Sequence, residues 1–218
     1  MTEAAKAFGD ETGTNVALKA GPPAAWMEEA KQDADLVFSG SENMMTDFVN
    51  ALSGQIKSED VLPLYLRPSA ILVRPGNPGR IRGLSDLFQP GHRVIVVNGA
   101  GQTGLWEDMA GKLGDIASVK ALRSNIKVFA ANSAEARQAW LQDQTLDAWI
   151  IWNIWQVANP DLADLVAVEP AYRIYRDAGI VLTKRGKDKP EAVAFKTFLT
   201  GAKAAAIFAK WGWLTTVP

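Results

Sequence analysis

The segment from Val94 to Ala110 constrains the fold of this chain more than any other. An apolar run, Val94-Ile-Val-Val97, leads into the turn Gly99-Ala-Gly-Gln-Thr-Gly104, and an amphipathic stretch follows. A strand that passes through a glycine turn into a helix directs backbone N–H groups and the positive end of a helix dipole at one point, which suits an anion. The glycine spacing also matches the dinucleotide fingerprint. The turn is therefore predicted to face either a cofactor pyrophosphate or a free anion.

The dinucleotide interpretation requires an acidic residue near the end of the next strand, where it would bind the ribose hydroxyls. That strand is Lys127–Ala130, and the residues after it are Ala131-Asn132-Ser133. A phosphate loop of the Walker type is also disfavoured, because no Lys-Ser or Lys-Thr follows the glycines. A free anion is therefore favoured as the ligand of the glycine turn. The alternative is that the chain is an enzyme with a phosphate-containing cofactor at Gly99–Gly104.

Short apolar stretches alternate with amphipathic ones along most of the chain. Strands are expected at 15–19, 36–38, 64–73, 94–97, 127–130, 148–151, 165–167 and 172–183, and helices at 2–12, 24–32, 43–53, 84–87, 103–113, 134–142 and 190–210. This alternation predicts an α/β protein with parallel-type mixed sheets flanked by helices. In such sheets the ligand lies at the carboxyl ends of the strands.

Two long extended segments, 64–76 and 172–183, look like crossings between two lobes. The part between them is long enough to form a compact domain of its own. We therefore expect a discontinuous lobe 1 of residues 1–70 and 174–218, and a lobe 2 of residues 71–173. Closure about two such hinge crossings is the usual motion of proteins of this type.

The amino-acid composition argues against several classes of function. The net charge is −1, which gives no basic field for nucleic acid. The chain has no cysteine and a single histidine, His92, so thiol nucleophiles, zinc sites and histidine triads are disfavoured. No motif demands catalysis, and we expect no enzyme activity, no cofactor and no metal site. The longest apolar run, Ala148–Ala158, is too short to span a bilayer.

Several of the predicted strand-to-helix loops carry small polar residues. Ser39 and Ser41 follow one strand, Asn132 and Ser133 follow another, and Trp152-Asn153 ends a third. Such residues are common helix caps, so each loop by itself is better explained by a structural role than by a functional one. Together they offer neutral hydroxyl, amide and N–H donors of the kind that satisfies an oxyanion.

Four longer motifs carry a resemblance to a known family. They are Phe38–Phe48, Leu64-Tyr-Leu-Arg-Pro68, Asn98–Asp108 and Asp147–Gln156. With these motifs the chain resembles the periplasmic solute-binding proteins of ABC transporters, in the type II class that includes the molybdate and sulfate binders. The match looks closest to the accessory colonization factor (AcfC) group. The resemblance implies a two-lobed type II binding-protein fold with two hinge crossings.

The resemblance also implies a function. A non-enzymatic binder would hold a small oxyanion, such as sulfate or molybdate, between the lobes for ABC-type uptake, and would partner the transporter's membrane subunits. The residues it assigns to the ligand are Ser39, Ser41, Gly101, Gln102, Thr103, Asn132, Ser133, Trp152, Asn153 and Tyr172. A monomer in the periplasm or outside the cell is expected. The family normally opens with a strand that precedes the helix at Thr2–Phe8, so lobe 1 is expected to lack that strand.

No motif in the sequence distinguishes sulfate from molybdate or another tetrahedral anion as the ligand. A small organic acid or a phosphate-bearing solute is the main alternative ligand, with Arg67, Arg173 or Arg176 as the carboxylate partner. Arginine favours such bidentate contacts, although arginines near a crossing also form surface ion pairs.

Overall fold

The computed structural model describes residues 1–215 and divides them into two compact units. Unit 1 comprises Met1–Leu66 together with the chain from Asp177 onward, and unit 2 comprises Arg67–Arg176. The chain passes from one unit to the other within two strands, β2 (Leu62–Val73) and β7 (Tyr175–Leu182). Both passages are extended backbone.

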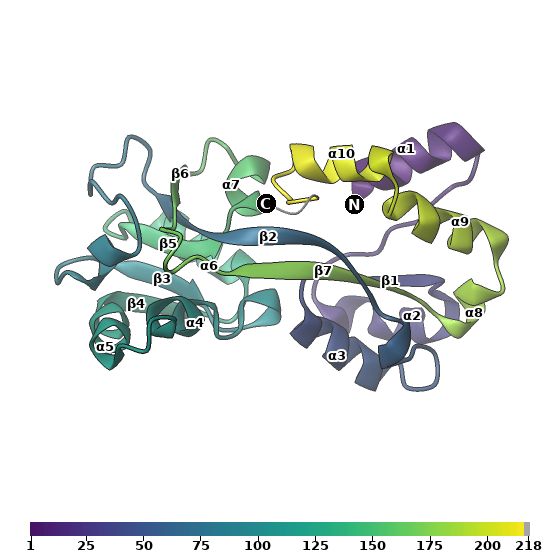
Figure 1. The fold of residues 1–218 in the computed structure, drawn as a ribbon, viewed down its shortest axis with the longest axis horizontal. Coiled ribbons are helices and arrows are strands. Elements are labelled where there is room, and N and C mark those ends of the chain that lie inside the picture. Colours follow the sequence, from purple (N-terminus) through teal and green to yellow (C-terminus); the bar gives the residue numbers. More distant parts are fainter. Residues whose placement is uncertain (216–218) are drawn as a thin grey trace. The chain divides into compact units, whose positions relative to one another are not determined.

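Unit 1 is built around an antiparallel pair of strands. In it, β1 (Leu36–Ser39) pairs with β7, with Val37 opposite Val181. Side chains alternate between the two faces of the pair, as the strand period requires. Val37 and Val181 pack on α2 (Met27–Asp33) and α3 (Glu42–Ala51), whereas Phe38 meets Phe208 on the other face. Figure 1 shows the helices of unit 1 in layers on both sides of these strands.

The remaining elements of unit 1 are helical. They are α1 (Thr2–Thr12), η1 (Pro23–Ala25), η2 (Ser58–Asp60), α8 (Lys184–Lys187), α9 (Pro190–Leu199) and α10 (Ala202–Lys210). The predicted helix at 2–12 is confirmed. The single helix predicted over 190–210 is wrong, because the chain breaks at Thr200-Gly201 and the two helices meet at 58°.

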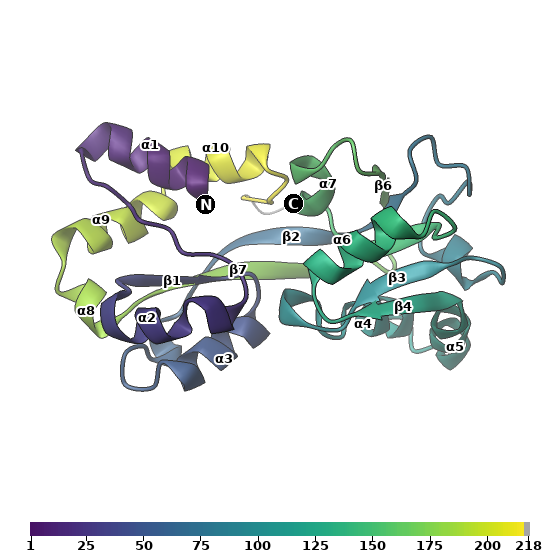
Figure 2. The same ribbon diagram turned by 180° about the vertical axis from the view of Figure 1, so that it is seen from behind.

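The strand predicted over Asn15–Lys19 is also wrong. The residues have extended backbone without strand pairing, and the side chain of Leu18 is 41% exposed. Alternation of apolar and polar residues gives a strand only where a neighbouring strand supplies hydrogen bonds, and within residues 1–215 this segment pairs with none. Figure 2 shows it as the coil that leads from α1 towards α2.

Unit 2 contains a mixed sheet centred on β3 (Val94–Val97). Its neighbours β4 (Ile126–Ala130) and β5 (Ala148–Trp152) run parallel to it. The end of β2 runs antiparallel to β5 and to β6 (Asp164–Ala167). The sheet is thus mixed, as expected, with its parallel part at the glycine turn.

Helices cover both faces of this sheet, which explains why every residue of β3 is buried. Val94 and Val96 pack on α4 (Leu105–Gly111) and α5 (Ile116–Asn125), while Ile95 and Val97 face α6 (Ser133–Gln142). The two sides are visible in Figures 1 and 2. The glycine turn therefore starts from a strand held rigidly on both sides.

Three further helical segments complete unit 2: η3 (Ser85–Phe88), η4 (Ala100–Gln102) and α7 (Ile154–Ala158). Helices α5, α7 and α8 were not predicted from the sequence. The start of α5 did carry a signal, because Asp115 caps it by accepting hydrogen bonds from the N–H groups of Ala117 and Ser118.

Within residues 1–215 no single helix is long and apolar enough to cross a membrane. Taken together, α9 and α10 meet the requirements of length and composition, but they are bent at the break between them.

Candidate functional site

The loops that follow β3, β4 and β5 come together at one edge of the sheet in unit 2. The parallel register places Val97 beside Ala130, and the N–H of Asn98 donates to the carbonyl of Ala130 over 2.9 Å. The carboxyl ends of parallel strands are where α/β proteins bind ligands. This edge brings together seven of the predicted residues, which we call the polar edge: Gly101, Gln102, Thr103, Asn132, Ser133, Trp152 and Asn153.

The glycines of the turn each have a local structural role. A Cβ on Gly99 would stand 2.1 Å from the carbonyl oxygen of Ala131, so only glycine lets the two loops approach this closely. Gly104 has a φ of 72° and begins α4 in the left-handed conformation. The carbonyl of Gly101 accepts a hydrogen bond from the indole Nε1 of Trp152 at 3.1 Å. Packing at Gly99 and the backbone conformation at Gly104 thus require glycine, whereas the carbonyl contact of Gly101 does not.

Gln102 and Ser133 form a hydrogen-bonded link between two of the loops. The Nε2 of Gln102, a residue only 4% exposed, donates to the Ser133 Oγ over 2.7 Å. Because the hydroxyl oxygen accepts from Gln102, its own proton is free to be donated to a third group. Asn132 caps α6, since its Oδ1 accepts from the N–H of Glu135 at 2.9 Å. The link therefore presents a hydroxyl donor at the start of a ten-residue helix.

Two arginines lie over the ring of Trp152. The guanidinium carbons of Arg67 and Arg176 stand 5.0 and 5.8 Å from the ring centroid, within the range of cation–π attraction. Arg176 also donates to the carbonyl of Thr103 at 2.9 Å and pairs with Asp108 at 2.6 Å. Two guanidinium groups and the carboxylate of Asp108, which is paired with Arg176, thus lie at this part of the polar edge.

The other arginine named from the sequence has a different role. Arg173 donates through Nε and Nη2 to the carbonyl of Val168, which holds a turn closed. Tyr172 packs its ring against Phe88, with centroids 5.4 Å apart and the rings nearly perpendicular, at the margin of the large apolar cluster. These contacts favour a packing role for Tyr172, and its predicted contact with ligand stays a prediction. Asn153 continues from β5, and its N–H donates to the carbonyl of Pro68.

The two serines predicted in unit 1 are both only 1% exposed. The Ser39 hydroxyl donates its proton to the carbonyl of Ser41 at 2.9 Å. Ser41 caps α3, because its Oγ accepts from the N–H of Met44 at 3.2 Å. Ser39 has therefore already used its proton, whereas the hydroxyl of Ser41 keeps one to donate.

Carboxylates accompany this loop. Glu42 is the first residue of α3, and Asp177 opens the part of β7 that belongs to unit 1. Partial burial, the negative charge of Asp177 and a hydrogen bond with it together raise the pKa of Glu42. The Ser39–Ser41 loop is thus flanked by acid, in contrast to the polar edge.

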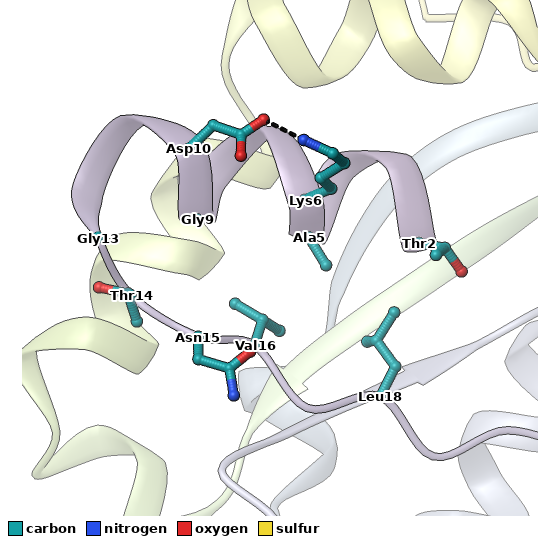
Figure 3. Close-up of a pocket in the computed structure, with 10 residues that line it drawn as sticks. All are labelled: Thr2, Ala5, Lys6, Gly9, Asp10, Gly13, Thr14, Asn15, Val16 and Leu18. Atoms are coloured by element: carbon teal, nitrogen blue, oxygen red, sulfur yellow. Dashed lines mark hydrogen bonds and ion pairs between the residues drawn. The ribbon is translucent and has the colours of Figure 1, made fainter.

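The structure also has two surface hollows that contain none of the predicted ligand residues. One, of about 520 Å³, lies in unit 1 between α1 and the extended segment after it, where Thr2, Gly9 and Leu18 are among its lining residues (Figure 3). The other, of about 410 Å³, lies in unit 2 beside Arg80 and His92.

A metal site and a histidine-based catalytic site find no support in this geometry. Within residues 1–215, no three histidine, aspartate or glutamate side chains lie together as metal ligands would. His92 approaches Asp147, with 3.9 Å between Nδ1 and Oδ2, at the amino end of β3 rather than at the polar edge.

A protein family and several solved structures are similar to this chain. Residues 1–214 match the family described as bacterial extracellular solute-binding protein. The crystal structure of PEB3 bound to L-phospholactate is 34% identical in sequence and covers 99% of this chain and 94% of its own, with a TM-score of 0.92. Peb3 from Campylobacter jejuni has the same identity and coverage and a TM-score of 0.91.

A more distant structure shares the fold. The sulfate-binding protein SubI from Mycobacterium tuberculosis is 20% identical, and the match covers 100% of this chain and 83% of that protein with a TM-score of 0.77. Among curated protein sequences, none matches this chain. The matched proteins bind solutes rather than transform them, so the expected non-enzymatic function is confirmed at the level of the family. This chain belongs to the bacterial extracellular solute-binding proteins.

Proposed function

We propose that the polar edge of unit 2 binds the anionic group of a small solute. The observation that carries this proposal is that one edge of the sheet holds a hydroxyl donor, a helix start and two arginines over Trp152. Ser133 offers a hydroxyl proton, α6 begins at the same point, and Arg67 and Arg176 supply positive charge. Anions gain from helix starts and from charge-assisted hydrogen bonds of this type.

A simple tetrahedral oxyanion, sulfate- or molybdate-like, is the first candidate ligand. Neutral hydroxyl and N–H donors match its acceptor oxygens, and two guanidinium groups lie at the same edge of the sheet. Ser39 and Ser41 as additional donors from unit 1 stay a prediction, and the free proton of Ser41 supports them better than the bonded hydroxyl of Ser39.

An organic acid that carries a phosphate is the second candidate. Two guanidinium groups near one indole suit a ligand with more than one anionic group, because arginine binds both carboxylate and phosphate in a forked geometry. The 34% identical PEB3 was crystallised with L-phospholactate, which has both groups. For this chain, such a ligand is a proposal on an equal footing with the oxyanion.

A single panel of ligands tests both candidates. Sulfate, molybdate, tungstate, phosphate and L-phospholactate are titrated while tryptophan fluorescence and the melting temperature are measured. A ligand at 100 times its Kd raises the free energy of unfolding by about 2.7 kcal/mol, which is readily detected. Saturation by sulfate or molybdate at lower concentration than L-phospholactate supports the first candidate, and the reverse order the second. No saturable response to any member of the panel contradicts anion binding.

The proposal also covers the group, the oligomeric state, the location and the partner of this chain. We place the chain in the AcfC group, as a monomer in the periplasm that delivers its solute to the membrane subunits of an ABC transporter. Membership of the solute-binding family supports delivery to a transporter. Copurification with membrane subunits and the mass in solution test these assignments.

A further inference from the structure

One dipeptide at the polar edge has a chemistry that anion binding does not use. Asn98-Gly99 is the single Asn-Gly pair in the sequence, and it forms the first two residues after β3. An asparagine side chain is attacked by the backbone nitrogen of the next residue most easily when that residue is glycine, because no Cβ hinders the approach. The conformation of the pair decides whether this reactivity is suppressed.

The structure leaves the reacting groups unprotected. Asn98 lies outside the helices and strands, and its side chain is exposed. Within residues 1–215 the Asn98 amide forms no hydrogen bond, and the Gly99 nitrogen donates to no acceptor. Asn98 is anchored through its backbone N–H, which donates to the carbonyl of Ala130. Its side chain takes no part in this contact.

Asn132 provides an internal comparison in the neighbouring loop. It is also exposed and is followed by a small residue, Ser133. Its Oδ1, however, is held by the N–H of Glu135 as the cap of α6, and Ser133 is the first residue of that helix. The same side chain is therefore fixed at position 132 and unconstrained at position 98. Asn77 and Asn159 precede prolines, which have no N–H to lose.

We infer that Asn98 is a site of spontaneous deamidation in the loop that follows β3. The backbone nitrogen of Gly99 forms a bond to Cγ of Asn98, the bond from Cγ to the side-chain nitrogen breaks, and that nitrogen leaves as ammonia with the proton of the Gly99 N–H. Water then opens the cyclic imide at either carbonyl, so the product is aspartate or isoaspartate. No oxidant, metal or enzyme is required.

The product changes the electrostatics of the polar edge. A neutral amide becomes a carboxylate one residue from Gly99, whose carbonyl accepts from the N–H of Gln102 at 3.2 Å. A negative charge at this place opposes an anion bound near Gln102 and Ser133. We expect the affinity for an anion to fall by roughly three- to tenfold, from Coulomb repulsion across partly solvated space. This consequence rests on the proposed function, whereas the modification does not.

The experiment follows both the chemistry and the binding. Purified protein is incubated warm at alkaline and at mildly acidic pH, and peptide mapping by mass spectrometry measures deamidation at each asparagine. Asn98→Gln, which removes the favourable ring size, is the control, and Asn98→Asp imitates one product. Sulfate and L-phospholactate titrations are made on fresh, aged and Asn98→Asp protein.

The expected result is conversion at Asn98 before any other asparagine, none at position 98 in the Asn98→Gln variant, and weaker anion binding by aged and Asn98→Asp protein. Conversion at Asn132 as early as at Asn98 overturns the inference, as does an Asn98 that stays intact while other asparagines convert. If fresh protein binds neither probe, anion binding fails while the mass spectrum still decides on the modification.

Discussion

The polar edge of unit 2 and the Ser39–Ser41 loop of unit 1 start from the same local pattern. In each, a strand ends in small polar residues, and one of these residues caps the next helix: Asn132 caps α6 and Ser41 caps α3. Their surroundings differ. The polar edge gathers three loops and two arginines around Trp152, whereas the serine loop is nearly closed to solvent and stands beside Glu42 and Asp177.

Under the proposed function, the difference between the two loops means that a helix cap is not sufficient to make an anion site. A cap satisfies the N–H groups of its own helix, and only donors that are left over can bind a ligand. At the polar edge the Ser133 hydroxyl still has a proton to donate after it accepts from Gln102, and two guanidinium groups lie over Trp152. At the serine loop the hydroxyl of Ser39 is used locally, and the nearby charge is negative.

The largest loss of stability is expected from a side chain placed where the loops after β3 and β4 touch. In Gly99→Ala the new Cβ would overlap the carbonyl oxygen of Ala131, so the two loops must separate. We expect unit 2 to lose about 1–3 kcal/mol of stability, as in other overpacked sites. The measurement is urea unfolding followed by tryptophan fluorescence. Gly111→Ala is the matched control, because its Cβ would make an ordinary contact, 3.7 Å from Val119. Equal stability of the two variants would contradict this account.

The next effect tests the difference in charge directly. Arg67→Met keeps the bulk beside Trp152 and removes the positive charge, so we expect anion affinity to fall by about 10- to 100-fold, the value of one charge-assisted hydrogen bond. Titration calorimetry with the best anion of the panel is the measurement. Arg80→Met, at an exposed arginine of the second hollow, is the control and should bind normally. The proposal fails if both variants bind alike.

Much of the fold could be predicted because periodicity and burial agree. The Val94–Val97 strand and the Thr2–Thr12 helix were found at their observed bounds, since one is apolar on both faces and the other has a single apolar stripe. Asn15–Lys19 shows the limit, because alternation does not reveal whether a partner strand is present. Helix α5 was missed because only Leu122 and Asn125 in it are buried, which gives no clear apolar stripe, and because its cap, Asp115, is one acid among many.

The candidate site was predictable to a smaller extent. Residues that follow strands were identified because parallel strands align their ends, which is a property of the fold class. The roles inside the site were not predictable, since they depend on contacts between distant segments. Arg67 and Arg176 lie over the same ring although 109 positions separate them in the sequence. Tyr172 packs on Phe88, a contact that no local pattern indicates.

A smaller effect distinguishes the caps of the two loops. Asn132→Ala and Ser41→Ala each remove a cap, so each should cost about 1 kcal/mol in the free energy of unfolding. Aspartate also caps helices, so Asn132→Asp, at an exposed position, should restore that stability while adding negative charge. Ser41→Asp adds the same charge at a buried position beside Glu42, so it should not restore stability. We expect Asn132→Asp to weaken anion binding several-fold more than Ser41→Asp. Thermal unfolding and anion titration of the four variants are the measurements, and equal losses of affinity in the two aspartate variants would contradict a site centred on unit 2.

The smallest effect concerns the acid beside the serine loop. Because the pKa of Glu42 is raised, the folded chain holds that proton more tightly than the unfolded chain does, so stability is lost as pH rises through the raised pKa. Asp177→Asn removes the repulsion. We expect it to raise the melting temperature at pH 7 by an amount equivalent to less than about 1 kcal/mol, as for other solvent-screened pairs. Below the ordinary pKa of glutamate Glu42 is protonated in both states, so most of the gain should disappear, and added salt should reduce it at pH 7. A gain of the same size at both pH values would mean that the two carboxyl groups do not interact, and the electrostatic contrast between the two loops would then rest on the arginines alone.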